Sequence, residues 1–131
     1  MIIDTSALVA VLLDEPERAA FEQAIATDPW PRISAATYVE AGIVVDARRD
    51  PTRSRMLDSL LASADIAIEP VTAEQATIAR HAYRDFGKGS GHPARLNLGD
   101  CFAYALAKAS DEELLFKGND FSHTDVRPAR P

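Results

Sequence analysis

Short apolar segments alternate with helical patterns along the chain, and this alternation constrains the fold more than any other feature. Segments that read as strands are Ile2-Ile3, a short stretch around Ile33, residues 66–71 and residues 114–116. Helical spacing of apolar residues separates them. Short apolar strands joined by helices predict an α/β fold, in which a central parallel sheet is covered by helices on both faces.

The intervening patterns predict the helices. They are expected at residues 7–13, 16–25, 35–48, 57–64, 73–86 and 100–110. Thr72 and Gln75 have the spacing of a capping box for the fifth of these helices. Val126 could add an edge strand near the end of the chain. Because no linker or repeat interrupts this order, residues 1–131 are expected to form a single domain.

Composition restricts the function classes. Cys101 is the one cysteine, which excludes an internal disulfide framework, and it is expected to be a core residue. No apolar run has the length of a membrane span, and we expect a cytoplasmic protein. Fourteen Lys and Arg against twenty Asp and Glu give a formal charge of −6. This balance disfavours a nucleic-acid partner unless the acids are pooled in one pocket and basic patches lie elsewhere.

Four acidic residues are expected near the edge of the parallel sheet at which its strands end. Asp4 and Asp120 follow the first and last strands, Asp100 opens an apolar helix, and Glu40 lies on an apolar helix face that we expect to be buried. Helix capping or turn formation would also explain each Asp on its own. Parallel topology brings the carboxyl ends of strands to one edge, however, and carboxylates clustered there need cations. Oxygen ligands of this kind favour Mg²⁺ or Mn²⁺.

Four sequence blocks resemble those of PIN-domain ribonucleases, specifically the VapC toxins of bacterial VapBC toxin–antitoxin pairs. The blocks are Ile-Ile-Asp-Thr-Ser-Ala at residues 2–7, Ser-Ala-Ala-Thr-Tyr-Val-Glu at 34–40, Leu-Asn-Leu-Gly-Asp-Cys-Phe-Ala-Tyr-Ala-Leu-Ala at 96–107, and Leu-Leu-Phe-Lys-Gly-Asn-Asp-Phe at 114–121. The likeness covers essentially the whole chain. It implies a single PIN domain with a sandwich of helices around the short sheet.

The resemblance also implies an activity. In this family an acidic quartet binds one or two Mg²⁺ or Mn²⁺ ions and hydrolyses RNA. Asp4, Glu40 and Asp100 match three of the four acidic positions. Many relatives read Leu-Leu-Thr-x-Asp-x-Asp-Phe in the last block, where this chain has Gly118 at the first Asp. Asp120 is therefore the expected fourth acid, with Asn119 as a neutral helper.

Substrate contacts and partners follow from the same resemblance. Thr5 or Ser6 is expected to hydrogen-bond the site or a phosphate. Expected contacts of the RNA backbone are Lys88, His92, Arg95 and Lys117. A VapB-type antitoxin and an RNA substrate, with transfer RNA as the family-level suggestion, are the implied partners. The helix at 35–48 is apolar nearly all round, which suggests a homodimer.

Two other functions remain open from the sequence. A PIN-fold binding module without catalytic activity would keep the same fold and partner. A phospho-receiver or aspartyl-phosphate phosphatase also places acids at strand ends, but Asp4-Thr5-Ser6 lacks the second aspartate that such phosphatases carry. Our interpretation is a divalent-metal-dependent endoribonuclease toxin.

Overall fold

A four-stranded parallel sheet lies at the centre of the computed structural model, which describes all residues from 1 to 131. Its strands are β1 (Ile2–Ile3), β2 (Arg32–Ser34), β3 (Ala67–Glu69) and β4 (Leu114–Leu115), in the order β3-β2-β1-β4. Ile2 of the central strand pairs with Arg32 and with Leu114. The four predicted strands are confirmed. The edge strand expected at Val126 is wrong, because only an isolated bridge joins Leu114 to Pro128.

Six α-helices and one 3₁₀ helix connect and cover the strands. They are α1 (Thr5–Leu12), α2 (Arg18–Thr27), α3 (Ala35–Asp46), α4 (Pro51–Ser63), α5 (Ala73–Phe86), α6 (Leu98–Ser110) and η1 (Asp120–His123). The capping box expected at α5 is half formed. Thr72 Oγ1 accepts a hydrogen bond from the Gln75 N–H at 3.1 Å, but the Gln75 side chain makes no return bond and its Oε1 is buried without a partner.

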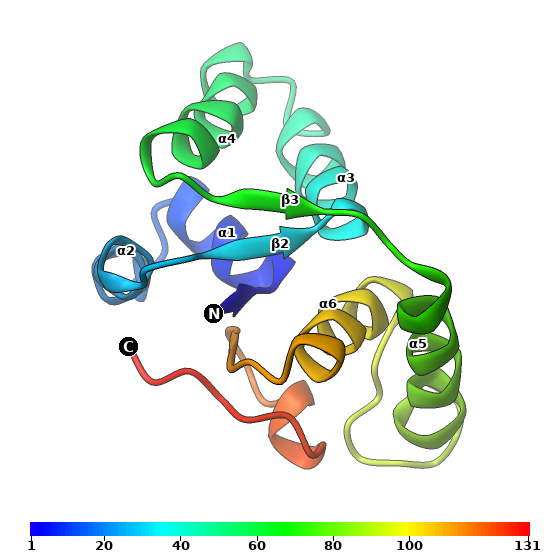
Figure 1. Ribbon diagram of the computed structural model, residues 1–131. Coiled ribbons are helices and arrows are strands. Elements are labelled where there is room, and N and C mark those ends of the chain that lie inside the picture. The colour runs from blue at the N-terminus through cyan, green and yellow to red at the C-terminus, as the bar shows by residue number, and fades with distance from the viewer.

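The strands send alternate side chains into two separate cores. Ile2 and Leu114 belong to the core under α5 and α6, whereas Ile3 and Leu115 belong to the core under α1 to α4. Since successive side chains of a strand point to opposite faces, even these two-residue strands serve both layers. Figure 1 shows α3 and α4 on one side of β2 and β3, and α5 and α6 on the other. The predicted α/β sandwich is confirmed.

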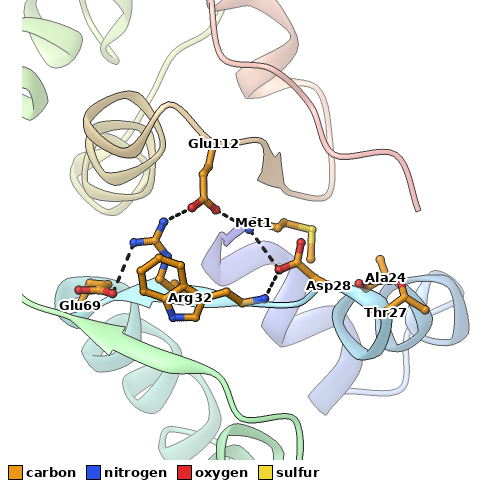
Figure 2. A network of polar contacts seen from close by, with 8 residues as sticks. Met1, Ala24, Thr27, Asp28, Arg32, Glu69 and Glu112 are labelled. Atoms are coloured by element: carbon orange, nitrogen blue, oxygen red, sulfur yellow. Dashed lines mark hydrogen bonds and ion pairs between the residues drawn. The ribbon is translucent and has the colours of Figure 1, made fainter.

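The amino-terminal edge of the sheet is occupied by an ion-pair network. Arg32 is paired with Glu112 and with Glu69, and Glu112 also accepts from the Met1 ammonium group (Figure 2). The Arg32 guanidinium carbon lies 3.9 Å from the centre of the Trp30 ring. The two terminal nitrogens of Arg32 are thus paired with carboxylates at this edge, while its Nε is buried without a hydrogen-bond partner.

The carboxyl-terminal edge is where the chain leaves β1, β2 and β4 toward Thr5, Ala35 and Phe116. Helix α5 lies beyond the arrowheads of β2 and β3 (Figure 1). Ligands of parallel sheets bind outside this edge, so the residues that follow the strands are the candidates for a functional site. None of the helices is both long enough and apolar enough to cross a membrane.

Candidate metal centre

Asp4 is held by local structure at the end of β1. It is the N-cap of α1, is only 1% exposed, and its Oδ2 accepts from the Ser6 N–H at 2.9 Å and from Ser6 Oγ at 2.6 Å. Its other oxygen, Oδ1, is buried and has no hydrogen-bond partner. Burial raises the pKa of Asp4, against the hydrogen bonds from Ser6. Capping therefore explains one oxygen of this carboxylate and leaves the other unexplained.

Asp100 lies in the first turn of α6 and is fixed by a capping box. The Asn97 N–H donates to Asp100 Oδ2 at 2.9 Å, and the Asp100 N–H donates to Asn97 Oδ1 at 2.8 Å. Burial, together with the smaller effect of the charges of Asp4, Asp120 and Glu40, raises the pKa of Asp100 to about 7. Asp100 therefore lies close enough to the other three acids that the sequence singled out to feel their charges.

Glu40 reaches the same cluster from α3, but not from a buried helix face. The prediction of burial is wrong: Glu40 is half-buried, and its neighbours Val39 and Ile43 are 58% and 63% exposed. Thr37, Ala41 and Val45 form the face of α3 that packs into the core. Because α3 carries apolar residues on all of its faces, the sequence pattern does not indicate which face is buried in the monomer.

The carboxylate of Glu40 lies against the backbone of Gly99. A β-carbon added to Gly99 would fall 1.8 Å from Glu40 Oε2, so no other residue at position 99 is compatible with this arrangement. Sequence reasoning missed Gly99. The available signal was a glycine directly before Asp100, in the first turn of a helix where glycine is unfavourable.

Asp120 is the expected fourth acid and follows the last strand of the sheet. It is the first residue of η1, beyond β4, and is exposed. Its charge contributes to the raised pKa of Asp100. Asn119, the N-cap of η1, makes no capping hydrogen bond with its side chain. Neither side chain makes a hydrogen bond or an ion pair within the chain, so both are free to bind a ligand.

None of the four acids is neutralised by a basic side chain. Every ion pair of the chain involves other carboxylates, and Asp4, Glu40, Asp100 and Asp120 have no Lys, Arg or His nitrogen within 4.0 Å. No three of the His, Cys, Asp and Glu side chains converge closely enough to hold an ion between them as they stand. Two carboxylates ~4 Å apart repel by about 4 kcal/mol at a dielectric of 20, which favours such a spread arrangement without a cation.

The donor set fits a divalent cation. All the candidate ligands are carboxylate oxygens, as hard cations prefer, and Asp4 Oδ1 is a buried acceptor that nothing in the chain satisfies. Asp4 and Asp100 are fixed by hydrogen bonds to their second oxygens. The side chains of Glu40 and Asp120 are less restrained and can move toward an ion.

The two hydroxyls after Asp4 have different environments. Ser6 Oγ donates to Asp4 and accepts from the Lys117 N–H at 3.0 Å, so it connects the ends of β1 and β4. Thr5 Oγ1 is buried without a partner. The Lys117 ammonium group pairs with Glu15 and, at 3.0 Å, with Glu17. The expected contact of Lys117 with the RNA backbone stays a prediction, and in the absence of RNA its ammonium group is held by these two carboxylates.

Lys88, His92 and Arg95 lie on the loop between α5 and α6. The Lys88 N–H donates to the Leu96 carbonyl at 2.8 Å, which closes the base of this loop next to the start of α6. Lys88 and Arg95 are exposed and unpaired, whereas His92 is partly buried, with its ring 5.0 Å from that of Phe86. Cys101 is buried and free, as predicted.

Known proteins resemble this chain over nearly its whole length. The sequence model of the PIN domain matches residues 1–127. Ribonuclease VapC28 of Mycobacterium tuberculosis is 57% identical over 98% of this chain and 97% of its own length, and Ribonuclease VapC42 of the same species is 50% identical over 98% of both chains.

Solved structures share the fold at low sequence identity. VapC20 of Mycobacterium tuberculosis, described as a Sarcin-Ricin loop cleaving toxin, superposes with a TM-score of 0.77 at 16% identity, covering 99% of this chain and 98% of that one. VapBC2 from Rickettsia felis, bound to a DNA fragment from its promoter, gives 0.76 at 13% identity, with 98% and 96% covered. The matched family and the close relatives together show that this chain belongs to the PIN-domain family and, within it, to the VapC ribonucleases.

Proposed function

We propose that this chain is the toxin of a type II toxin–antitoxin pair and hydrolyses phosphodiester bonds of RNA at the four-acid cluster. The observation that carries the proposal is the buried, unpartnered Oδ1 of Asp4 beside Asp100, in a cluster that no basic residue neutralises. Ribonucleases of this family generally depend on a divalent metal ion. For this chain we propose Mg²⁺ or Mn²⁺, as one or two ions.

The roles of the residues follow from their hydrogen bonds. The cation would be held by Asp4, Asp100, Glu40 and Asp120. Asn119 would assist as a neutral ligand or as a hydrogen-bond donor to the phosphate. A bound divalent ion supplies activated water near neutral pH and stabilises charge on the phosphate oxygens. Ser6 binds Oδ2 of Asp4, so Oδ1 stays free. The Asn97 N–H likewise binds Oδ2 of Asp100 and leaves the other oxygen of that carboxylate free. Because the pKa of Asp100 is raised to about 7, a bound cation would displace the proton from the fraction of molecules that carry it near neutral pH.

The partners of the proposed toxin are an RNA and a VapB-type antitoxin. The Klebsiella pneumoniae neighbour, with a TM-score of 0.70, is described as a toxin-antitoxin complex, which supports the second partner. The exposed apolar side chains Val39 and Ile43 on α3 support a homodimer, because large aliphatic side chains are seldom left in water together.

RNA cleavage by the purified chain tests the proposal. Total RNA and Mg²⁺ or Mn²⁺ should give defined fragments with the wild type, and none after chelation. Asp4→Asn and Asp100→Asn should each remove cleavage while the circular dichroism spectrum stays unchanged. Asp46→Asn, which removes a charge from an exposed position on α3, is the matched control and should cleave normally. Antitoxin binding without any cleavage by the wild type would instead support a catalytically silent binding module.

A further inference from the structure

Half of the basic side chains of this acidic protein are left without a carboxylate partner. Seven of the fourteen Lys and Arg residues have a carboxylate oxygen within 4.0 Å, and they are Arg18, Arg32, Arg53, Arg84, Lys108, Lys117 and Arg127. The remaining seven are unpaired. Apart from Arg130 near the end of the chain, they form two groups.

The two groups differ in their position relative to the candidate metal centre. Arg48 and Arg49 lie just beyond the far end of α3, about 18 Å along the helix from the sheet edge at which α3 begins, and Arg55 lies on α4, where it lines a cavity together with Ile43 and Asp46. Arg80, Lys88 and Arg95 lie on α5 and the loop after it. That loop closes beside Leu96, two residues before α6 and four before Asp100. The second group is therefore the one adjoining the site.

Helix α5 presents its cations together with an aromatic ring. Arg80 and Arg84 are one turn apart, and with His81 and Tyr83 they line a surface cavity of about 400 Å³. Tyr83 is 46% exposed, and its hydroxyl donates to the Lys88 carbonyl at 3.1 Å, which places Lys88 at the end of the same row. Arg84 binds Asp85 through Nε and Nη2 and keeps Nη1 free.

This combination matches the chemistry of a single-stranded nucleic acid. Guanidinium and ammonium groups in a row contact successive phosphates, and an exposed aromatic ring stacks a base without sequence preference. A chain with a net charge of −6 and four clustered acids repels RNA, so local cations next to the site are needed for association.

We propose that the exposed face of α5, consisting of Arg80, Tyr83, Arg84 and Lys88, binds the RNA strand outside the bond that is cleaved. Phosphates would contact the three basic side chains, and one base would stack on Tyr83. This inference rests on the proposed function, because it assigns the path by which the RNA substrate of the same site crosses the protein.

RNA binding in chelator tests the proposal separately from catalysis. Anisotropy of a fluorescein-labelled single-stranded RNA of about 12 nucleotides is measured with the full chain at several salt concentrations. Arg80→Gln/Lys88→Gln should weaken binding about tenfold at low salt and reduce the slope of log K against log[salt] by about 1.4. The matched control, Arg48→Gln/Arg49→Gln, removes the same charge from the distant group and should change binding less than about twofold. Equal losses in both double variants, or no loss in the α5 variant, would overturn the proposal.

The ring of Tyr83 gives an independent readout. Tyr83→Leu should weaken RNA binding at least about fivefold, whereas Tyr83→Phe, which keeps the ring, should bind within about twofold of the wild type. Equal binding by all three proteins would overturn the stacking role.

A small diester separates failure of this surface from failure of the proposed activity. Bis(p-nitrophenyl) phosphate has no phosphate or base beyond the diester that is cleaved, so Mn²⁺-dependent hydrolysis should be equal in the wild type and Arg80→Gln/Lys88→Gln. A wild type that hydrolyses neither this diester nor RNA contradicts the proposed function, and the binding data still decide the role of α5. A double variant that loses diester hydrolysis as well would show that the substitutions disturb the metal centre, which contradicts a role confined to RNA binding.

Discussion

Gly99 has no side chain at the point where the carboxylate of Glu40 rests. A β-carbon there would lie 1.8 Å from Oε2 and 2.5 Å from Oε1. Glu40 comes from α3 and Gly99 from the first turn of α6, next to Asp100, so this contact brings the third acid to the first two. The position of Glu40 thus depends on a residue that is not itself a candidate ligand.

Replacing Gly99 by alanine should separate stability from activity. The obstructing atoms are the end of a flexible side chain, so Glu40 can swing away at little cost to folding. Gly99→Ala should therefore keep the wild-type thermal midpoint within a few degrees and lose at least about tenfold in RNA cleavage and in Mn²⁺ affinity by calorimetry.

Gly42→Ala is the matched control for this substitution. Gly42 lies inside α3, and the nearest atom to an added β-carbon is Leu57 Cδ2 at 3.9 Å. This variant should be more stable by about 0.5–1 kcal/mol and should cleave RNA normally. Wild-type metal affinity in Gly99→Ala would show that Glu40 is not a ligand.

The raised pKa of Asp100 predicts how the stability of the metal-free protein depends on pH. The folded state keeps a proton on Asp100 up to about pH 7, whereas the unfolded chain releases it near the ordinary value of 3.8. The folded state therefore binds more protons between these values, and the free energy of unfolding falls as pH rises from about 4 through 7. Asp100→Asn should remove this loss and be more stable than the wild type at pH 8 by about 1–2 kcal/mol, after allowance for partial solvent exposure.

Urea unfolding at pH 5 and pH 8 in chelator measures this difference. Asn can still accept the hydrogen bond from Asn97, so the capping box remains in the variant. At pH 8, added Mg²⁺ should raise the free energy of unfolding of the wild type but not that of the variant. An identical pH dependence of the two proteins would contradict a proton held at Asp100.

The pattern of apolar residues within short segments of the sequence predicts much of the fold. Ile2-Ile3 and Leu114-Leu115 are apolar on both faces, which is typical of strands in a covered parallel sheet, and Asp4 follows its strand directly. Parallel topology then brings distant strand ends together. The expectation that the four acids would be neighbours needed only this rule, and the charges acting on Asp100 agree with it.

Other features depend on contacts between distant segments, which no local pattern encodes. Lys117 and Glu15 are 102 residues apart, and nothing near Lys117 indicates that its charge is used there. The helical wheel of α3 shows apolar residues on all sides, so it could not tell that Glu40 lies on the exposed side. Gly99 has a role only because α3 packs next to α6.

Ser6 is expected to act through Asp4. Ser6→Ala removes the bond to Asp4 Oδ2 and the bond from the Lys117 N–H, which together hold that carboxylate. Cleavage should fall about 10–100-fold, with a matching loss of metal affinity, and Ser6→Thr should recover part of both. Ser63→Ala, which removes an exposed hydroxyl bonded to the Leu60 carbonyl, is the control. Unchanged metal affinity in Ser6→Ala would refute a positioning role.

Substitution of Asp120 and of Asn119 compares how much each side chain contributes to RNA cleavage. Asp120 is charged and influences Asp100, so Asp120→Asn should reduce cleavage by about 10–100-fold, less than Asp4→Asn does. Asn119→Ala should reduce it only a few-fold. Single-turnover cleavage of a labelled RNA measures both, and the reverse order would assign the fourth position to Asn119.

The exposed face of α3 predicts the oligomeric state. Val39→Asp/Ile43→Asp places charges where we propose that two copies meet, and it should shift the protein from dimer to monomer in sedimentation experiments. Val71→Asp, at a residue that is 37% exposed outside this face, should leave the dimer intact. A wild type that sediments as a monomer at all concentrations would contradict the dimer.

Diffraction from a crystal soaked in Mn²⁺ tests the central claim most directly. The account predicts an anomalous peak within about 2.5 Å of Asp4 Oδ1, with an oxygen of Asp100 as a second ligand and Glu40 or Asp120 turned toward it. No peak at a concentration of Mn²⁺ that supports RNA cleavage, or a peak bound elsewhere on the chain, would contradict it.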